Sequence, residues 1–114
     1  VKLDDIVDSL VIDPRKLTEY ALNYNSKQGK DTALVFEQVL GFTLENYQEL
    51  LRQLEENCLS ANAKFYRAIE QGALYQVDII IEGKANRQAS VRTGFLVKPG
   101  TRVAHLTTVY VLGR

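Results

Sequence analysis

The residues best suited to chemistry in this sequence are an imidazole and a guanidinium on neighbouring predicted strands. His105 is the only histidine of the chain and lies mid-strand, while Arg92 lies in the strand before it. RNA cleavage without a metal ion needs proton transfer at the 2′-hydroxyl and at the leaving oxygen, and a cation that stabilises the pentavalent phosphate. We therefore consider a metal-independent endoribonuclease, with His105 as general base or acid and Arg92 as phosphate stabiliser.

This hypothesis depends on which strand face His105 occupies. If Leu106, Tyr110 and Leu112 face the predicted helices, then His105, Thr107 and Val109 face away from them, as Arg92 does. A register slip of one residue would exchange His105 for Leu106. In the structural alternative, His105 is hydrogen-bonded to threonine or backbone on a solvated face, and Arg92 pairs with Asp78 across a hairpin.

A polar break at residues 23–31 separates two apolar-periodic segments and carries further candidates. Lys16 and Tyr20 are four residues apart and share a helical face, while Lys30 precedes a predicted helix whose first turn attracts anions. We expect a small anion-binding corner beside the sheet. The predicted substrate-binding residues are Lys16, Tyr20, Lys30, Thr108 and Tyr110. The alternative is an ordinary helix-ending loop with solvated lysines.

Other kinds of site find little support. The chain has no phosphate loop or dinucleotide glycine pattern, and with one histidine and one cysteine it lacks the residues of a multi-cysteine zinc site. No cofactor or metal is expected. Cys58 lies on a leucine stripe, where cysteine usually serves as a small apolar residue, so a Cys58–His105 dyad is disfavoured.

Composition indicates one soluble domain spanning residues 1–114, with 46% hydrophobic and 25% charged residues. Residues 1–60 carry six Lys/Arg and eleven Asp/Glu, a net charge of −5, and residues 61–114 carry eight and three, a net of +5. The basic half suits an anionic partner such as RNA, although the two halves can also simply neutralise each other. The acidic N-terminus, the single cysteine and the absence of a long apolar run favour a cytoplasmic protein with no membrane partner. The chain does not begin with Met, which is typical of an excised part of a longer protein.

The helical part is expected at about 14–60 and the sheet part at about 62–113. Asp13-Pro14 begins a first short helix, a second starts at Asp31 or Thr32 and ends at Gly41, and a third follows Thr43 with a strong leucine stripe. Period-two patterns predict strands at 73–83, 87–98 and 102–112, joined by short turns. Residues 8–13 can add a short strand, and 63–72 are strand or helical turn. The predicted fold is α+β, with three N-terminal helices on one face of a 3–4-stranded antiparallel meander.

Residues 14–112 resemble a family of uncharacterised bacterial and phage domains. The matching positions are Lys16, Tyr20, Leu22, Asn23, Gly29, Lys30, Phe36, Leu40, Gly41, Arg92, Thr93, Gly94, Pro99, Thr108 and Tyr110. This family of domains of unknown function is similar to C-terminal toxin domains of polymorphic-toxin and phage proteins. Its helix-then-sheet layout is also that of barnase-like and RelE-like ribonuclease toxins, an analogy of fold alone. Relatives often carry His-Pro in the first loop, where this chain reads "NYNSK".

The resemblance implies a toxin-like domain with RNA as substrate and a cognate inhibitor or partner protein. The alternative is a non-catalytic interaction or accessory module. Its acidic helical half or a sheet edge would then bind a partner or a second copy of the chain. The final strand, through residues 109–112, is the predicted seam of such a homo-oligomer if it is an edge strand.

Overall fold

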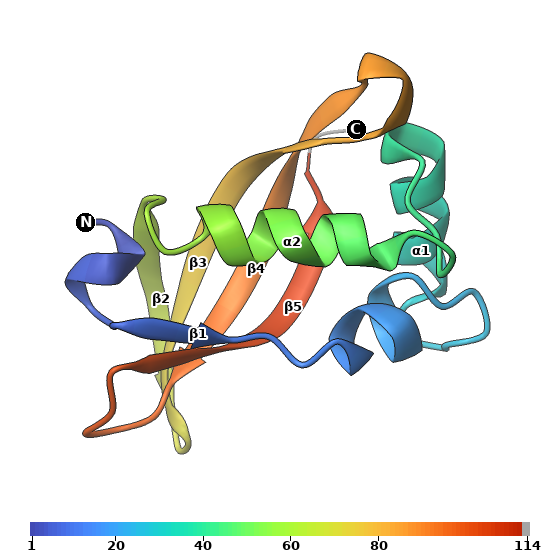
Figure 1. Cartoon of the computed structure of the whole chain (residues 1–114). Helices are drawn as coiled ribbons and strands as arrows, with labels where there is room; N and C mark the ends of the chain where they lie inside the picture. The colour runs from blue at the N-terminus through green and yellow to red at the C-terminus, as the bar shows by residue number, and fades with distance from the viewer. Residues whose placement is uncertain (113–114) are drawn as a thin grey trace.

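The protein, described here by a computed structural model over residues 1–112, is built on a sheet with one long helix across one face (Figure 1). The five strands lie in the order β1-β5-β4-β3-β2. Their bounds are β1 Ser9–Val11, β2 Ala63–Ile69, β3 Gly72–Glu82, β4 Gln88–Val97 and β5 Val103–Val111. The helices are α1 Lys30–Val35 and α2 Tyr47–Asn57, with short helical segments η1 Leu3–Asp5, η2 Lys16–Ala21, η3 Phe36–Leu40 and η4 Lys84–Asn86.

Strands β2 to β5 form the predicted antiparallel meander. The region 63–72 resolves into β2 and the start of β3, and ten residue pairs join β3 to β4. The alternation predicted for β3 is confirmed, because Val77, Ile79 and Ile81 are buried while Asp78 and Ile80 are exposed. Short turns can only join neighbouring antiparallel strands, which is why this part of the sheet was readable from sequence.

The prediction of a purely antiparallel, 3–4-stranded sheet is wrong. A fifth strand, β1, pairs in parallel with β5, with Ser9 opposite Val103 and Val11 opposite His105. The segment had been considered only as a possible short strand. A strand of three residues such as β1 shows almost no hydrophobic periodicity. Its partner β5 lies at the other end of the sequence, so no local signal gives the direction of pairing.

The expectation of three helices packed on the sheet is also wrong. Within residues 1–112 only α2 is a long regular helix, and it begins at Tyr47 rather than directly after Thr43. The backbone N–H of Thr43 instead donates to Asn46 Oδ1, 2.7 Å away, in a turn before the helix. The two earlier segments are short, and they lie at one end of the sheet (Figure 1). Gly41 does end its segment in the predicted left-handed conformation, with φ of 77°.

A β-bulge changes the faces of β5 relative to simple alternation. Gly94 pairs with Thr108 while Phe95 pairs with Leu106, so Thr107 is the extra residue. The Thr107 hydroxyl donates to the Gly94 carbonyl oxygen at 3.0 Å. The prediction that Tyr110 faces the helices and Val109 faces away is therefore wrong. Beyond the bulge Val109 is buried at 6% exposure, whereas Tyr110 is 40% exposed.

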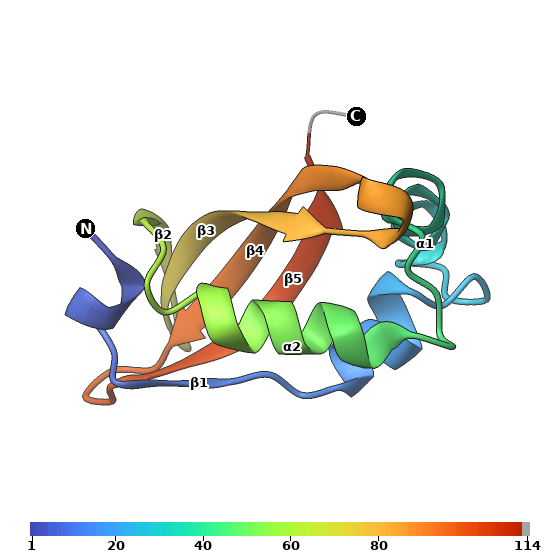
Figure 2. The same cartoon turned by 45° about the horizontal axis from the view of Figure 1, so that its top comes forward.

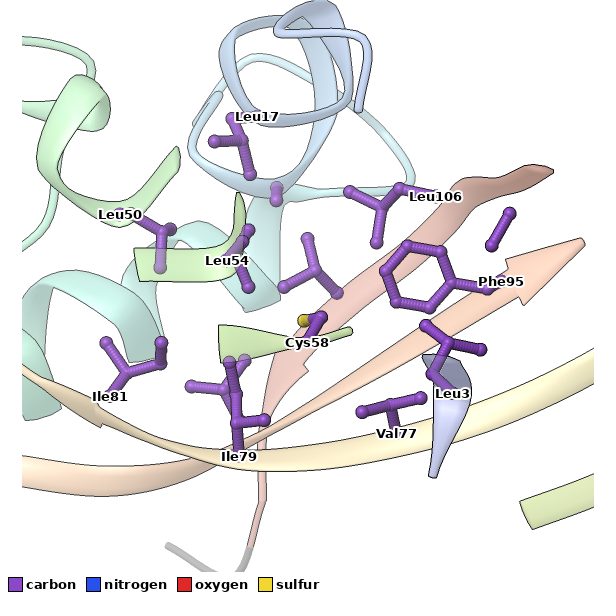
Figure 3. Packing of buried hydrophobic residues seen from close by; sticks show 14 of the residues in the cluster. Leu3, Leu17, Leu50, Leu54, Cys58, Val77, Ile79, Ile81, Phe95 and Leu106 are labelled. Atoms are coloured by element: carbon purple, nitrogen blue, oxygen red, sulfur yellow. The ribbon is translucent and has the colours of Figure 1, made fainter. Parts of the chain in front are cut away.

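The core lies between α2 and one face of the sheet. Both views place α2 across the same side of strands β3 to β5 (Figures 1 and 2). Leucines 50 and 54 of α2 pack against side chains of the strands, and Leu3 of η1 and Leu17 of η2 belong to the same cluster (Figure 3). At Cys58 the thiol lies within this layer, as its place on the leucine stripe predicted.

The opposite side of the sheet, here called the open face, carries mostly polar side chains. It consists of the residues that alternate with the buried set, and those that matter below are Lys64, Arg67, Leu74, Gln76, Asp78, Arg92, Gly94, Leu96, His105, Thr108 and Tyr110. His105 and Arg92 thus share one face, as the sequence predicted. The short helical segments η2 and α1 meet the sheet at β5, and a cavity lies at this junction.

Candidate functional site

A cavity of about 390 Å³ lies where η2 and the start of α1 meet the second half of β5. We call it the edge cleft. Its lining residues are Lys16, Tyr20, Ala21, Gln28, Gly29, Thr32, Thr107, Thr108, Val109 and Tyr110. Four of the five predicted substrate-binding residues, Lys16, Tyr20, Thr108 and Tyr110, therefore come together, although the two pairs are about ninety residues apart in the sequence. Lys30, the fifth, is exposed at the first position of α1 and does not line the cleft.

A close backbone contact fixes the helical wall of the cleft. A Cβ atom on Gly29 would lie 1.7 Å from the Tyr20 carbonyl oxygen, so only glycine allows the loop to reach η2 at this point. The Ser26 hydroxyl accepts a hydrogen bond from the Gly29 N–H at 3.1 Å, which closes the loop before α1. The glycine of the predicted polar break therefore sets how closely α1 approaches Tyr20.

Charge in the cleft comes from Lys16. Its ammonium lies 5.8 Å from the centroid of the Tyr20 ring, within range of a cation–π contact. Outside the cleft, Arg15 pairs with Asp13 at 2.7 Å. Hydrogen bonds from Arg15 hold the pKa of Asp13 down at about 2. The basic and acidic groups beside η2 thus neutralise each other, whereas no ion pair involves Lys16 among residues 1–112.

On the open face Arg92 is held by a bidentate ion pair. Its Nε and Nη2 donate to the two carboxylate oxygens of Asp78 at 2.9 and 3.0 Å, and this pairing raises the Arg92 pKa. In the orientation that satisfies both groups, the Gln76 amide oxygen accepts from Nη1 of Arg92 at 2.9 Å. The alternative role predicted for Arg92, as the partner of Asp78 across the hairpin, is confirmed. Its strand partner on the other side is Tyr110, so the guanidinium lies next to the edge cleft.

His105 is half-buried on the same face, opposite Leu96. Its imidazole has no hydrogen-bond partner among residues 1–112. Arg92 and Leu96 are four positions apart on β4, so His105 and Arg92 are separated by ~13 Å along the strands. They share a face but do not meet. Thr108 lies between them, three residues beyond His105 and opposite Gly94, at the rim of the edge cleft.

Sequence reasoning did not identify Gln28, Thr32 and Thr107 as lining residues. The first two carry no signal beyond polarity, and Thr107 enters the wall only because of the bulge. The sequence motif Arg92-Thr93-Gly94 has a physical explanation in the structure, because the second and third residues each have a specific structural role. The buried Thr93 hydroxyl donates to the Val77 carbonyl at 2.7 Å, and a Cβ on Gly94 would lie 2.6 Å from Thr108 Oγ1.

Some other chemistries lack a site within residues 1–112. No group of three or more His, Cys, Asp or Glu side chains is placed to hold a metal ion there. Burial raises the pKa of the Cys58 thiol to about 12, so this sulfur is a poor nucleophile. No helix in the described part of the chain is long and apolar enough to cross a membrane.

Comparison with known proteins gives one match. The family described as a domain of unknown function (DUF6883) matches residues 2–113, nearly the entire chain. No curated protein and no solved structure matches. The chain belongs to this DUF6883 family.

Proposed function

We propose that this DUF6883 domain is a metal-independent endoribonuclease that binds single-stranded RNA at the edge cleft. One observation carries the proposal: four residues chosen from the sequence as substrate contacts, Lys16, Tyr20, Thr108 and Tyr110, line one cavity. Its volume of about 390 Å³ falls in the range of small-ligand pockets. An RNA nucleotide is a ligand of this size.

The lining matches the chemistry of a nucleotide. Lys16 supplies a cation for a phosphate, and the hydroxyls of Thr108 and Tyr110 donate to its oxygens. Tyr20 and Tyr110, each about two-fifths exposed, present ring surface on which an unpaired base stacks. Because base stacking and phosphate contacts carry little sequence information, we expect weak base preference.

The proposed reaction is attack by the 2′-hydroxyl on the adjacent phosphate. The phosphate lies over Thr108, with His105 on one side and the cleft on the other. His105 takes the 2′-hydroxyl proton while the O2′–P bond forms. The P–O5′ bond then breaks and O5′ takes a proton from the Lys16 ammonium, so the products are a 2′,3′-cyclic phosphate and a 5′-hydroxyl. Arg92, next to Tyr110, stabilises the charge that gathers on the phosphate. Exchange with water restores both protonation states.

The test is incubation of the pure protein with total RNA, with and without a chelator, beside matched variants. His105→Ala and Lys16→Ala each remove a proton-transfer group, so each should lower the cleavage rate by ~10²-fold or more. Lys84→Ala removes an equal charge from the exposed turn between β3 and β4 and should leave the rate unchanged. Wild-type cleavage should persist in chelator and produce 2′,3′-cyclic ends. Intact RNA after incubation with the wild type, or equal rates in all variants, would refute the proposal.

A further inference from the structure

The strand register aligns a row of residues that leads from the edge cleft across the open face. Thr108 on β5 pairs with Gly94, Gly94 pairs with Gln76 on β3, and Gln76 pairs with Lys64 on β2. The row begins at the rim of the cleft and ends at the opposite edge of the sheet. Three strand spacings separate its ends, a span of ~14 Å.

A second row runs parallel to the first and also ends in a cation. His105 pairs with Leu96, Leu96 pairs with Leu74, and Leu74 pairs with Arg67 of β2. The bulge between Phe65 and Arg67 keeps Arg67 on the same face as Lys64. Both rows therefore run from β5, where the proposed chemistry takes place, to a positive charge on β2.

The two β2 cations are free to bind an anion. Lys64 and Arg67 are exposed, and neither takes part in an ion pair among residues 1–112. By contrast, Arg92 between them and the cleft is held by Asp78. The acidic residues Asp78 and Glu82 lie on the open face further along β3, outside both rows, so the residues at the β2 end of the rows carry positive charge.

The middle of the first row carries no long exposed side chain, because Gly94 is buried beneath the hydroxyl groups of Thr107 and Thr108. Gly94 has no side chain, and the neighbouring Gln76 is half-buried with its amide turned toward Arg92. Exposed aromatic surface lies between the two β2 cations in the sequence, where Tyr66, the extra residue of the bulge, is 50% exposed. Alternating cations and aromatic rings are the usual surface for unpaired nucleotides.

We propose that the open face is an extended RNA-binding track, on which a single strand leaves the edge cleft, crosses β4 and β3, and places its next phosphates on Lys64 and Arg67. This inference rests on the proposed function, since it extends that substrate beyond the cleaved bond. A dinucleotide fills the cleft alone, while a longer strand also reaches β2. The track thus makes the enzyme prefer oligonucleotides over dinucleotides.

The experiment measures binding of fluorescent 2′-O-methyl RNA, which lacks the attacking hydroxyl and is not cleaved. A dinucleotide and an octamer are titrated into wild type, the double variant Lys64→Ala/Arg67→Ala and the charge control Lys84→Ala. We expect the double variant to bind the octamer ~10-fold more weakly and the dinucleotide unchanged. The slope of log affinity against log salt should fall by ~1.4 for the octamer, since two phosphate contacts are lost.

The outcomes separate the track from the cleft. If wild type binds both RNAs and the double variant binds the octamer as tightly as Lys84→Ala does, the track is refuted while the cleft proposal stands. An equal loss of affinity for the dinucleotide and the octamer in the double variant also refutes the track, because the two substitutions would then be disturbing the edge cleft itself. Polyglutamate that competes with the octamer as well as unlabelled octamer does would assign the face to an acidic protein instead. If no RNA binds and none is cleaved, the proposed function fails first.

Discussion

Replacing Gln53 by leucine should destabilise the domain by about 2 kcal/mol. Gln53 lies on α2 and is 6% exposed. Its side-chain amide hydrogen-bonds to the backbone at the end of β3, in the way that a neighbouring strand would. Its Nε2 donates to the Glu82 carbonyl oxygen at 2.7 Å, and its Oε1 accepts from the Glu82 N–H at 2.9 Å. The amide therefore satisfies both backbone groups of Glu82 and fixes α2 across the sheet.

The magnitude follows from two opposing terms. Leucine has nearly the volume of glutamine, so packing changes little, but two backbone groups lose their partners at ~2 kcal/mol each. Burial of the apolar leucine side chain regains ~2 kcal/mol. The net loss is about 2 kcal/mol, which a urea titration resolves as a lower midpoint at unchanged slope.

The matched control is Gln48→Leu, at an exposed position near the start of the same helix, where we expect a change within ~0.5 kcal/mol. Hydrogen exchange at the Glu82 amide supplies a second readout, because that proton loses its acceptor only in the Gln53 variant. Equal stability of the two variants, together with unchanged protection at Glu82, would show that this amide does not hold the helix on the sheet.

Three further predictions concern the cleft and the core. Gly29→Ala should weaken dinucleotide binding ~10-fold and lower the free energy of unfolding by at least ~2 kcal/mol, because the new Cβ would lie 1.7 Å from the Tyr20 carbonyl oxygen. A dinucleotide affinity and a urea midpoint equal to those of wild type would contradict this contact. Gly94→Ala should lower dinucleotide affinity ~5-fold and reduce the free energy of unfolding by less than ~2 kcal/mol, because the new Cβ would lie 2.6 Å from the Thr108 hydroxyl and displace it. An unchanged dinucleotide affinity would show that Thr108 does not contact the ligand. For Cys58 the pKa is raised from 9.0 to about 12 in the folded state, so its stabilising contribution is complete below pH ~9 and is lost as pH rises toward ~12, by up to about 4 kcal/mol. Urea titrations at pH ~8 and pH ~10.5 should therefore differ more for wild type than for Cys58→Ala, and parallel losses would argue against a buried thiol.

Most of the strands, but not the whole architecture, could be predicted from the sequence. The β3–β4 hairpin followed from alternation, because one face is buried and the other is not, and the Asp78–Arg92 pair followed from its register. The parallel partner of β5 could not be predicted, because pairing between Ser9 and Val103 leaves no local pattern. Helix count was overestimated since apolar spacing also occurs in short helical turns that pack at the end of a sheet.

The candidate site was predicted better in its members than in its geometry. Lys16 and Tyr20 were chosen for their shared helical face, and the cleft contains both. Tyr110 was chosen too, but with its side chain on the wrong face, because one inserted residue at Thr107 reverses the alternation after it. A bulge depends on how two strands fit each other, and neither strand alone encodes its position.

The pairing of β1 with β5 has a consequence during synthesis. Ser9–Val11 and Val103–His105 join the two ends of the sequence, and the edge cleft likewise needs η2 from the beginning and β5 from the end. A ribosome-bound chain therefore holds its first strand unpaired until almost all of the sequence has left the exit tunnel. The nascent polypeptide therefore has no assembled cleft before translation of the domain is nearly finished.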